Sequence, residues 1–305
     1  MIKYHCNNKN IDKKIPNNVT HLLFDCDINI DLPETIIHIT FGDDYNHHPD
    51  NLPSSLKYVY FGNYFNKPID NLPDSVEFLR VGIYFNIKIN KFPKSLKHLI
   101  LGNRYNKKID NLPNCLEHLT LGYYFNQRVD KLPNSLTHLT FHWYFNQPID
   151  KLPNSLTHLT LGWCFNQPVN NLPNSLTQLT LGWCFNQSID NLPKSIIYLE
   201  LGYHFNKSIN KIIDTVKIYR FRNYNFYSFN KEKLKNKYLI YTKNSIVWYR
   251  HNNFKCSYDE KIMKLQYFTQ EILFNELTKY IFNPERVLRI AEFYNLTFDE
   301  YLDFL

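Results

Sequence analysis

The chain lacks the segments that mark secreted and membrane proteins. Its first residues carry no apolar run of the kind found in secretory signals, and no stretch approaches the roughly 18 apolar residues of a membrane span. Its six cysteines show no CxxC or other zinc-ligand spacing, so we expect free thiols. These absences predict an intracellular, cytoplasmic protein that does not bind a membrane.

Glycine is also scarce, and its spacing excludes one kind of catalytic site. The eight glycines among 305 residues lie twenty residues, or a multiple of twenty, apart, so no Gly-rich phosphate-binding loop can form. No pair of carboxylates stands out, and the repeated serines and histidines bring a nucleophile and a base together only by chance. We therefore expect a non-enzymatic protein with no cofactor.

Charge of one sign is not gathered in any segment. The net charge is +7, but lysine and aspartate alternate, as in Asp130-Lys131 and Asp150-Lys151. Because no basic stripe results, we do not expect a nucleic acid as the partner.

A repeat of twenty residues runs through most of the chain. Prolines keep this period from Pro33 to Pro193, and His142 fills the one vacant place in the glycine register. The glycines are Gly42, Gly62, Gly82, Gly102, Gly122, Gly162, Gly182 and Gly202. Because so short a repeat cannot close a core alone, it must stack on its neighbours in a solenoid.

One repeat, residues 132–152, contains a strand and no amphipathic helix. From His138 to Phe141 polar and apolar residues alternate, so Leu139 and Phe141 should point inward while His138 and Thr140 face out. We expect the inner stack to be completed by Leu136, Phe145, Ile149 and Leu152. The glycine after the strand should let the backbone turn away sharply.

The predicted fold is a mainly β repeat solenoid, similar to leucine-rich repeats, with one parallel strand per repeat. Ten strands between Pro16 and Pro193, spaced about 4.8 Å apart, would span roughly 45 to 50 Å. The asparagine column from Asn46 to Asn206 suits an internal amide ladder that satisfies the backbone groups of the turns.

The ends of the chain depart from the repeat. We expect an N-terminal capping repeat at 1–32, regular repeats at 33–210, degenerate repeats and a junction at 211–256, and a small helical segment at 257–305. The helices either cap the open end of the solenoid or form a docking module. Trp248 should pack at the junction.

Two motifs carry a family resemblance. Phe65-Asn66-Lys67-Pro68-Ile69 and Phe145-Asn146-Gln147-Pro148-Ile149, together with the Leu-Pro-x-Ser-Leu-x-x-Leu-x-Leu-Gly pattern, resemble the FNIP repeats of giant DNA viruses and social amoebae. The resemblance implies a solenoid that binds other proteins, often after an F-box that recruits a ubiquitin ligase. If the chain is viral, it would act in the host cell. Since the first coil begins by residue 16, we expect no F-box before it.

Four histidines should lie in a row about 5 Å apart on the outer face of the strands, from His98 through His118 and His138 to His158. A linear row without a carboxylate or thiolate is a poor tetrahedral site, so we expect no metal there. A solvated, stacked ladder that resists protonation is the favoured interpretation.

Aromatic residues gather just after the strands of five consecutive repeats, which is typical of a protein-binding hot spot. The alternative is packing, in which each large ring covers the small thiol of Cys164 or Cys184; these thiols also lie close enough for a disulfide to be conceivable. The predicted partner-binding residues are Tyr123, Trp143, Trp163, Trp183, Tyr203, His118, His138, His158, Thr140, Thr160 and Thr180.

Two functions remain from the sequence. The first is an intracellular scaffold that holds a protein or peptide on the strand face of the solenoid. The second is a substrate-recognition adaptor of a ubiquitin ligase, with its recruiting element in the C-terminal helices.

Overall fold

The computed structural model of the chain describes residues 2–7, 14–25, 31–212, 216, 218–221, 238–243 and 246–250. Of these, 218–221, 238–243 and 246–250 are described by their backbone alone. The chain divides into two compact units, Met1–Trp248 and Tyr249–Leu305. The helical segment expected at 257–305 and the side chain of Trp248 lie outside what the structure describes.

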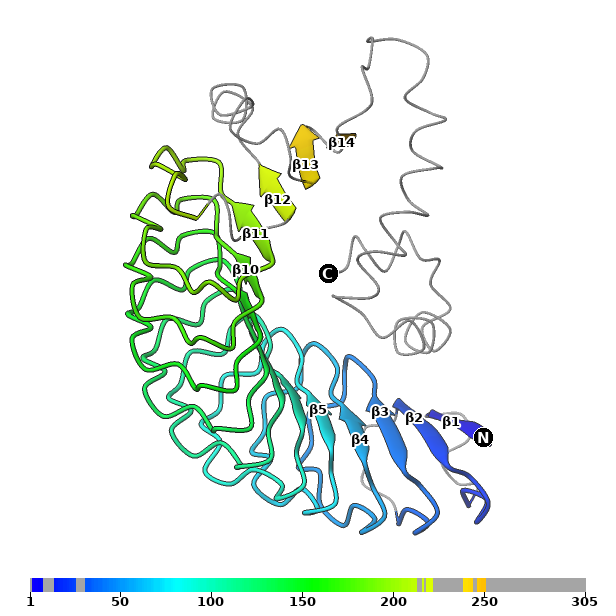
Figure 1. Cartoon of the computed structure of the whole chain (residues 1–305). Helices are drawn as coiled ribbons and strands as arrows, with labels where there is room; N and C mark the ends of the chain where they lie inside the picture. Colours follow the sequence, from blue (N-terminus) through cyan, green and yellow to red (C-terminus); the bar gives the residue numbers. More distant parts are fainter. Residues whose placement is uncertain are drawn as a thin grey trace, which may run out of the picture. The chain divides into compact units, whose positions relative to one another are not determined.

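One sheet of fourteen strands runs through the described residues, with the strands in sequence order. Each strand from β1 to β12 pairs in parallel with the next, and from β3 to β13 the paired residues are twenty apart, as in Leu139↔Leu159. The coils of β3 to β11 therefore stack in chain order with their strands side by side (Figure 1). The strands are β1 Lys3–Asn7, β2 His21–Asp25, β3 His38–Phe41, β4 Tyr58–Tyr60, β5 Phe78–Arg80, β6 His98–Ile100, β7 His118–Leu121, β8 His138–Phe141, β9 His158–Thr160, β10 Gln178–Thr180, β11 Tyr198–Leu201, β12 Ile218–Phe221, β13 Tyr238–Lys243 and β14 Ile246–Arg250.

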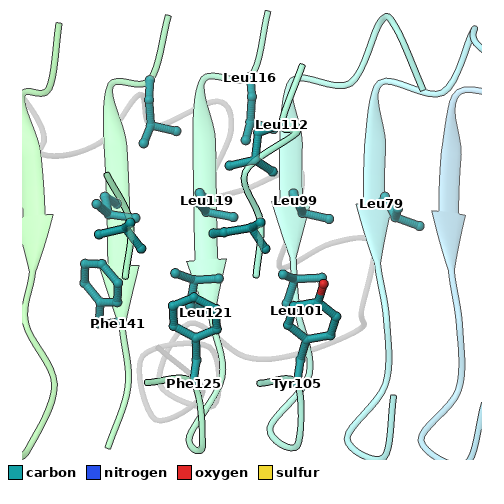
Figure 2. Close-up of a cluster of buried hydrophobic side chains, with 14 of the residues drawn as sticks. Leu79, Leu99, Leu101, Tyr105, Leu112, Leu116, Leu119, Leu121, Phe125 and Phe141 are labelled. Carbon is teal, nitrogen blue, oxygen red and sulfur yellow. The ribbon is translucent and has the colours of Figure 1, made fainter. Parts of the chain in front are cut away.

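The prediction of a parallel-strand solenoid is confirmed, and so is the inner stack. Leu139 and Phe141 point inward and are buried, whereas His138 and Thr140 are half-buried on the outer face. Leu136, Phe145, Ile149 and Leu152 are buried as well. Figure 2 shows this arrangement in neighbouring coils, where Leu99 and Leu119 lie side by side and Tyr105 stands beside Phe125. Each layer of the core thus rests on an equivalent layer twenty residues away.

Two polar ladders tie each coil to the next. The Oδ1 atom of each asparagine from Asn46 to Asn186 accepts the backbone N–H of the asparagine twenty residues later, at 2.8 to 3.1 Å. Ser135 donates its hydroxyl to the carbonyl of Leu116, and Cys115, which replaces serine, makes the same contact to Leu96. The amide ladder forms as predicted, but its residues are exposed or half-buried rather than internal.

The glycine column serves close packing rather than an unusual backbone conformation. No glycine has a positive φ in the described residues, so the expected sharp departure of the backbone is not what selects glycine. A Cβ on Gly162 would overlap the carbonyl oxygen of His142, and a Cβ on Gly182 would overlap that of Gly162. Because the obstructing atom belongs to the backbone of the previous coil, no side-chain rotation relieves the overlap.

His142 interrupts this column, and the sheet differs locally. Strands β7 and β8 are longer than most of their neighbours and pair one position further, at Leu121↔Phe141. The N–H of His142 then donates to the carbonyl of Leu121 at 3.2 Å. The His142 ring packs edge-on against Tyr123, with centroids 5.4 Å apart. The coil that holds a side chain at this position also carries Trp143, the first tryptophan to follow a strand.

Strands β12 and β13 continue the parallel pairing beyond the regular repeats, at Leu199↔Tyr219 and Tyr219↔Leu239. They keep the spacing of twenty residues that the regular repeats have. No helix among the described residues has the length and apolar character needed to cross a membrane.

Candidate interaction surface

A tight turn follows each strand and sets the position of the aromatic side chains. In the coil of Trp163, the N–H of Phe165 donates to the carbonyl of Gly162 at 3.1 Å, so Trp163 and Cys164 occupy the corners of the turn. The N–H of Cys164 also donates to the carbonyl of Trp143 in the previous coil, at 2.8 Å. Equivalent turns are therefore held directly above one another.

The corner residues of five successive turns form one surface, here called the aromatic ridge. Its members are Tyr123, Trp143, Trp163, Trp183 and Tyr203. The last four rings stack face to face, with centroids 4.4 to 4.5 Å apart and planes within 9° of parallel. Tyr123 meets Trp143 edge-on at 6.3 Å. Trp143 keeps 40% of its surface exposed and Tyr203 keeps 44%, while Trp163 and Trp183 are half-buried.

The two interpretations of the tryptophans both describe part of this geometry. The indole faces pack against one another, yet their edges remain on the surface. Cys164 and Cys184, the second corner residues of the coils that carry Trp163 and Trp183, are free and half-buried. Burial, and then the charge and hydrogen bond of the Cys184 thiol, raise the pKa of the Cys164 thiol. The ridge is thus an ordered stack that still offers aromatic surface to a partner.

A second aromatic column lies beside the ridge, and the sequence interpretation omitted it. Tyr64 stacks on Tyr84 at 5.1 Å, and Tyr124 stacks on Tyr144 at 5.2 Å. Between the pairs, the Arg104 guanidinium lies 4.4 Å from the centroid of the Tyr84 ring. All four tyrosines are exposed. Their twenty-residue spacing is the signal that would have found them.

The histidine row, His98, His118, His138 and His158, lies on the outer face of β6 to β9. Its rings stack with centroids 4.0 to 4.3 Å apart. The stack continues toward the N-terminus through Phe78 and Tyr60 to His38. Instead of being fully solvated, as expected, the four imidazoles are half-buried.

Threonine hydroxyls fix the proton on two of these rings. Thr137 donates its hydroxyl to the carbonyl of Glu117 at 3.1 Å, so it accepts a hydrogen bond from Nδ1 of His138, 2.8 Å away. Thr157 holds His158 in the same way. Burial lowers the pKa of His158, whose buried Nε2 has no hydrogen-bond partner among the described residues. The neutral form of the His158 imidazole is therefore favoured.

The threonines predicted as partner-binding residues lie next to the histidine row. Thr140, Thr160 and Thr180 pair in register on β8, β9 and β10, and all three are half-buried. The structure thus gathers the predicted residues into two areas of neighbouring coils. The histidines and threonines lie on the strand face, and the aromatic ridge lies on the turns that follow the strands.

Two solved structures resemble this chain. The crystal structure of CroV588, described as a novel circular LRR protein, is 42% identical and matches 75% of this chain with a TM-score of 0.66. YopM from Yersinia enterocolitica WA-314 is 20% identical over 68% of this chain, with a TM-score of 0.43. The matches cover 37% of CroV588 and 54% of YopM, so the chain spans less than two thirds of either protein. A comparison with curated proteins found no match.

A family model assigns the repeats. The FNIP Repeat model matches residues 28–64, 48–85, 65–104, 85–124, 105–143, 125–164, 145–184 and 185–213. These segments cover more than half of the chain and carry strands β3 to β11, the turns that follow them and the asparagine ladder. The chain therefore belongs to the FNIP repeat family.

Proposed function

We propose that this chain is a non-enzymatic interaction scaffold that holds a protein or peptide along the aromatic ridge and the adjoining strand face. The single observation behind the proposal is the row of partly exposed aromatic rings, four of them stacked, at the corners of five successive turns. Tryptophan and tyrosine dominate the binding energy of protein interfaces because they bury a large apolar area. Rings already held in a stack also lose little conformational entropy on binding.

The neighbouring strand face supports the same function. Thr140, Thr160 and Thr180 place hydroxyl groups at regular intervals along the strand face. An aromatic patch with a polar border is the composition of a typical protein interface. The solenoid relative CroV588 supports a scaffold architecture, since each repeat adds one more copy of the same surface. No observation favours a ubiquitin-ligase adaptor, whose expected recruiting element lies outside the described residues.

Affinity purification from the native cell, followed by mass spectrometry, tests this function. A triple variant with Trp143→Ala, Trp163→Ala and Trp183→Ala should lose the proteins that the wild-type chain retains. The matched control is Tyr64→Ala with Tyr84→Ala, which removes exposed rings from coils outside the ridge. Circular dichroism of each variant checks the fold. Retention of the same partner by a folded triple variant would refute the proposal.

A further inference from the structure

A carboxylate joins the histidine row at one point. Three side chains meet there, those of His98, Glu117 and His118. Each offers one nitrogen or oxygen atom as a ligand, and these three atoms lie within 4.8 Å of one another. All three side chains are half-buried, and no other group of this kind occurs among the residues that the structure describes. The expectation of a metal-free row rested on the missing carboxylate, so this cluster removes its premise.

The residue that precedes the outer-face residue of the strand differs between the coils. Threonines precede His138 and His158, and their hydroxyls hold the Nδ1 atoms of those rings at 2.8 Å. At His118, the preceding residue is Glu117 instead. An acidic ligand therefore takes the place that a neutral hydroxyl group occupies in the next two coils.

A second glutamate in the same column offers a contrast. Glu77 precedes Phe78, and its carboxylate binds the ammonium groups of Lys57 at 2.9 Å and Lys97 at 3.2 Å. Lys97, the residue one coil before Glu117, thus directs its charge to Glu77. The arrangement neutralises one glutamate with lysine and places the other beside two imidazoles.

The backbone around the cluster is well ordered by the sheet. His98 and His118 are direct partners in the pairing of β6 with β7. The N–H groups of Glu117 and His118 both donate to the carbonyl of Lys97, at 2.8 and 2.9 Å. With metal–ligand bonds near 2.1 Å, tetrahedral coordination needs ligand atoms roughly 3.4 Å apart. Because the paired strands fix the backbone, side-chain rotations that tilt the stacked rings would have to close this gap.

We propose that His98, Glu117 and His118 bind a divalent transition metal ion of the zinc type. Two imidazoles and a carboxylate are ligands that suit zinc and cobalt, and three protein ligands leave a coordination position for water. The ion would join β6 to β7 on the strand face. The aromatic ridge begins at Tyr123, on the turn after β7, and shares no residue with the metal site. Binding of a partner to the ridge and binding of a metal to His98, Glu117 and His118 can therefore be tested with separate variants.

Cobalt titration of the full chain, followed by visible absorption and by competition with zinc in calorimetry, tests the site. One ion should bind per chain. His98→Gln and Glu117→Gln should each weaken binding about tenfold or more, since each removes one of three ligands. Glu77→Gln and His158→Gln are matched controls from the same two columns and should bind as the wild type does.

Three results would overturn the proposal. The first is a wild-type chain that binds no cobalt or zinc. The second is a Glu117→Gln variant that keeps wild-type affinity, which would exclude the carboxylate as a ligand. The third is a strong near-ultraviolet absorption from cobalt–thiolate bonds, which would assign the metal to the cysteines. Because glutamine matches glutamate in shape, the Glu117 variant should keep its fold, and circular dichroism verifies this.

Discussion

The indole rings of Trp163 and Trp183 lie parallel, with their centroids 4.4 Å apart. Trp163 also stacks on Trp143 at 4.5 Å, so both of its faces are covered by indole. A partner therefore meets ring edges along the middle of the ridge and reaches a ring face only toward its ends. This limits the interface to contacts along the length of the stack.

The stack predicts a spectroscopic signature. Parallel stacked indoles couple electronically and weaken each other's absorption, so the far-ultraviolet indole band should gain intensity when the chain unfolds on heating. Trp163→Phe should remove most of this gain, because Trp163 belongs to both indole pairs. Tyr123→Phe is the control, since Tyr123 meets the stack edge-on. An unchanged gain in the Trp163 variant would show that the rings are not stacked in solution.

The glycine column predicts an asymmetry between two substitutions by alanine. Gly162→Ala adds a methyl group where the carbonyl of His142 lies, so it should cost about 2 kcal/mol or more in the free energy of unfolding. His142→Ala should cost about 1 kcal/mol or less, because that coil already accommodates a Cβ. Urea unfolding of both variants measures the difference, and equal losses would argue against backbone crowding.

The buried His38 predicts a dependence of stability on pH. Burial, with the nearby charges of His21 and Lys3, lowers its pKa from 6.5 to about 4. Between these values the unfolded chain binds a proton that the folded chain does not, so folding loses stability as the pH falls. The loss reaches about 3 kcal/mol at pH 4, and full stability returns above pH 6.5.

Thermal unfolding between pH 7.5 and 4.5 measures this effect. His38→Phe keeps a ring in the stack with Tyr60 but removes the titrating group, so its melting temperature should fall less over the same range. Burial lowers the pKa of His158 too, so part of the wild-type slope should remain in the variant. A wild-type melting temperature that does not change between pH 7.5 and 5.5 would contradict the prediction.

The asparagine ladder predicts a local effect on hydrogen exchange. Asn146 accepts hydrogen bonds from the N–H of Asn166 at 2.9 Å and from the side-chain amide of Gln167 at 3.2 Å. Asn146→Ala should therefore lower the free energy of unfolding by about 1 kcal/mol and speed exchange at Asn166. Asn134→Ala changes an exposed turn residue and should leave that exchange rate unaltered. Equal exchange rates in the two variants would show that the ladder contributes little.

The period of twenty was enough to predict the strands, their parallel pairing and the buried side chains. The inward direction of Leu139 and the hydrogen bonds of the asparagines follow from repetition, because equivalent residues in a stacked array must contact one another. The reason why glycine is required was harder to predict, because the atom that excludes a Cβ is a backbone carbonyl oxygen of the previous coil. A single repeat does not reveal how closely Gly162 approaches His142.

The candidate sites also contain residues that the sequence revealed and residues that it did not. The histidine and tryptophan columns were visible because each repeats one residue type. Glu117 was not, because its column mixes lysine, glutamate and threonine, and its proposed role depends on two histidines on adjacent strands. Tyr64 and Tyr144 were overlooked because Arg104 and the cysteines interrupt their column. Cross-coil neighbours, rather than neighbours along the chain, determine the chemistry of this fold.

The cross-coil bonds also bear on how an array of this kind can change its length. Each asparagine bonds to the asparagine one repeat later, and each turn serine to a carbonyl of the coil before it. If one whole repeat is lost or duplicated, the coils that become neighbours present the same donors and acceptors, so the polar ladders close again. Insertions of any other length would shift Gly162 and its equivalents out of register with the carbonyls they must clear. Recombination between repeats can therefore lengthen or shorten the surface in whole steps, while the residues at the turn corners vary independently.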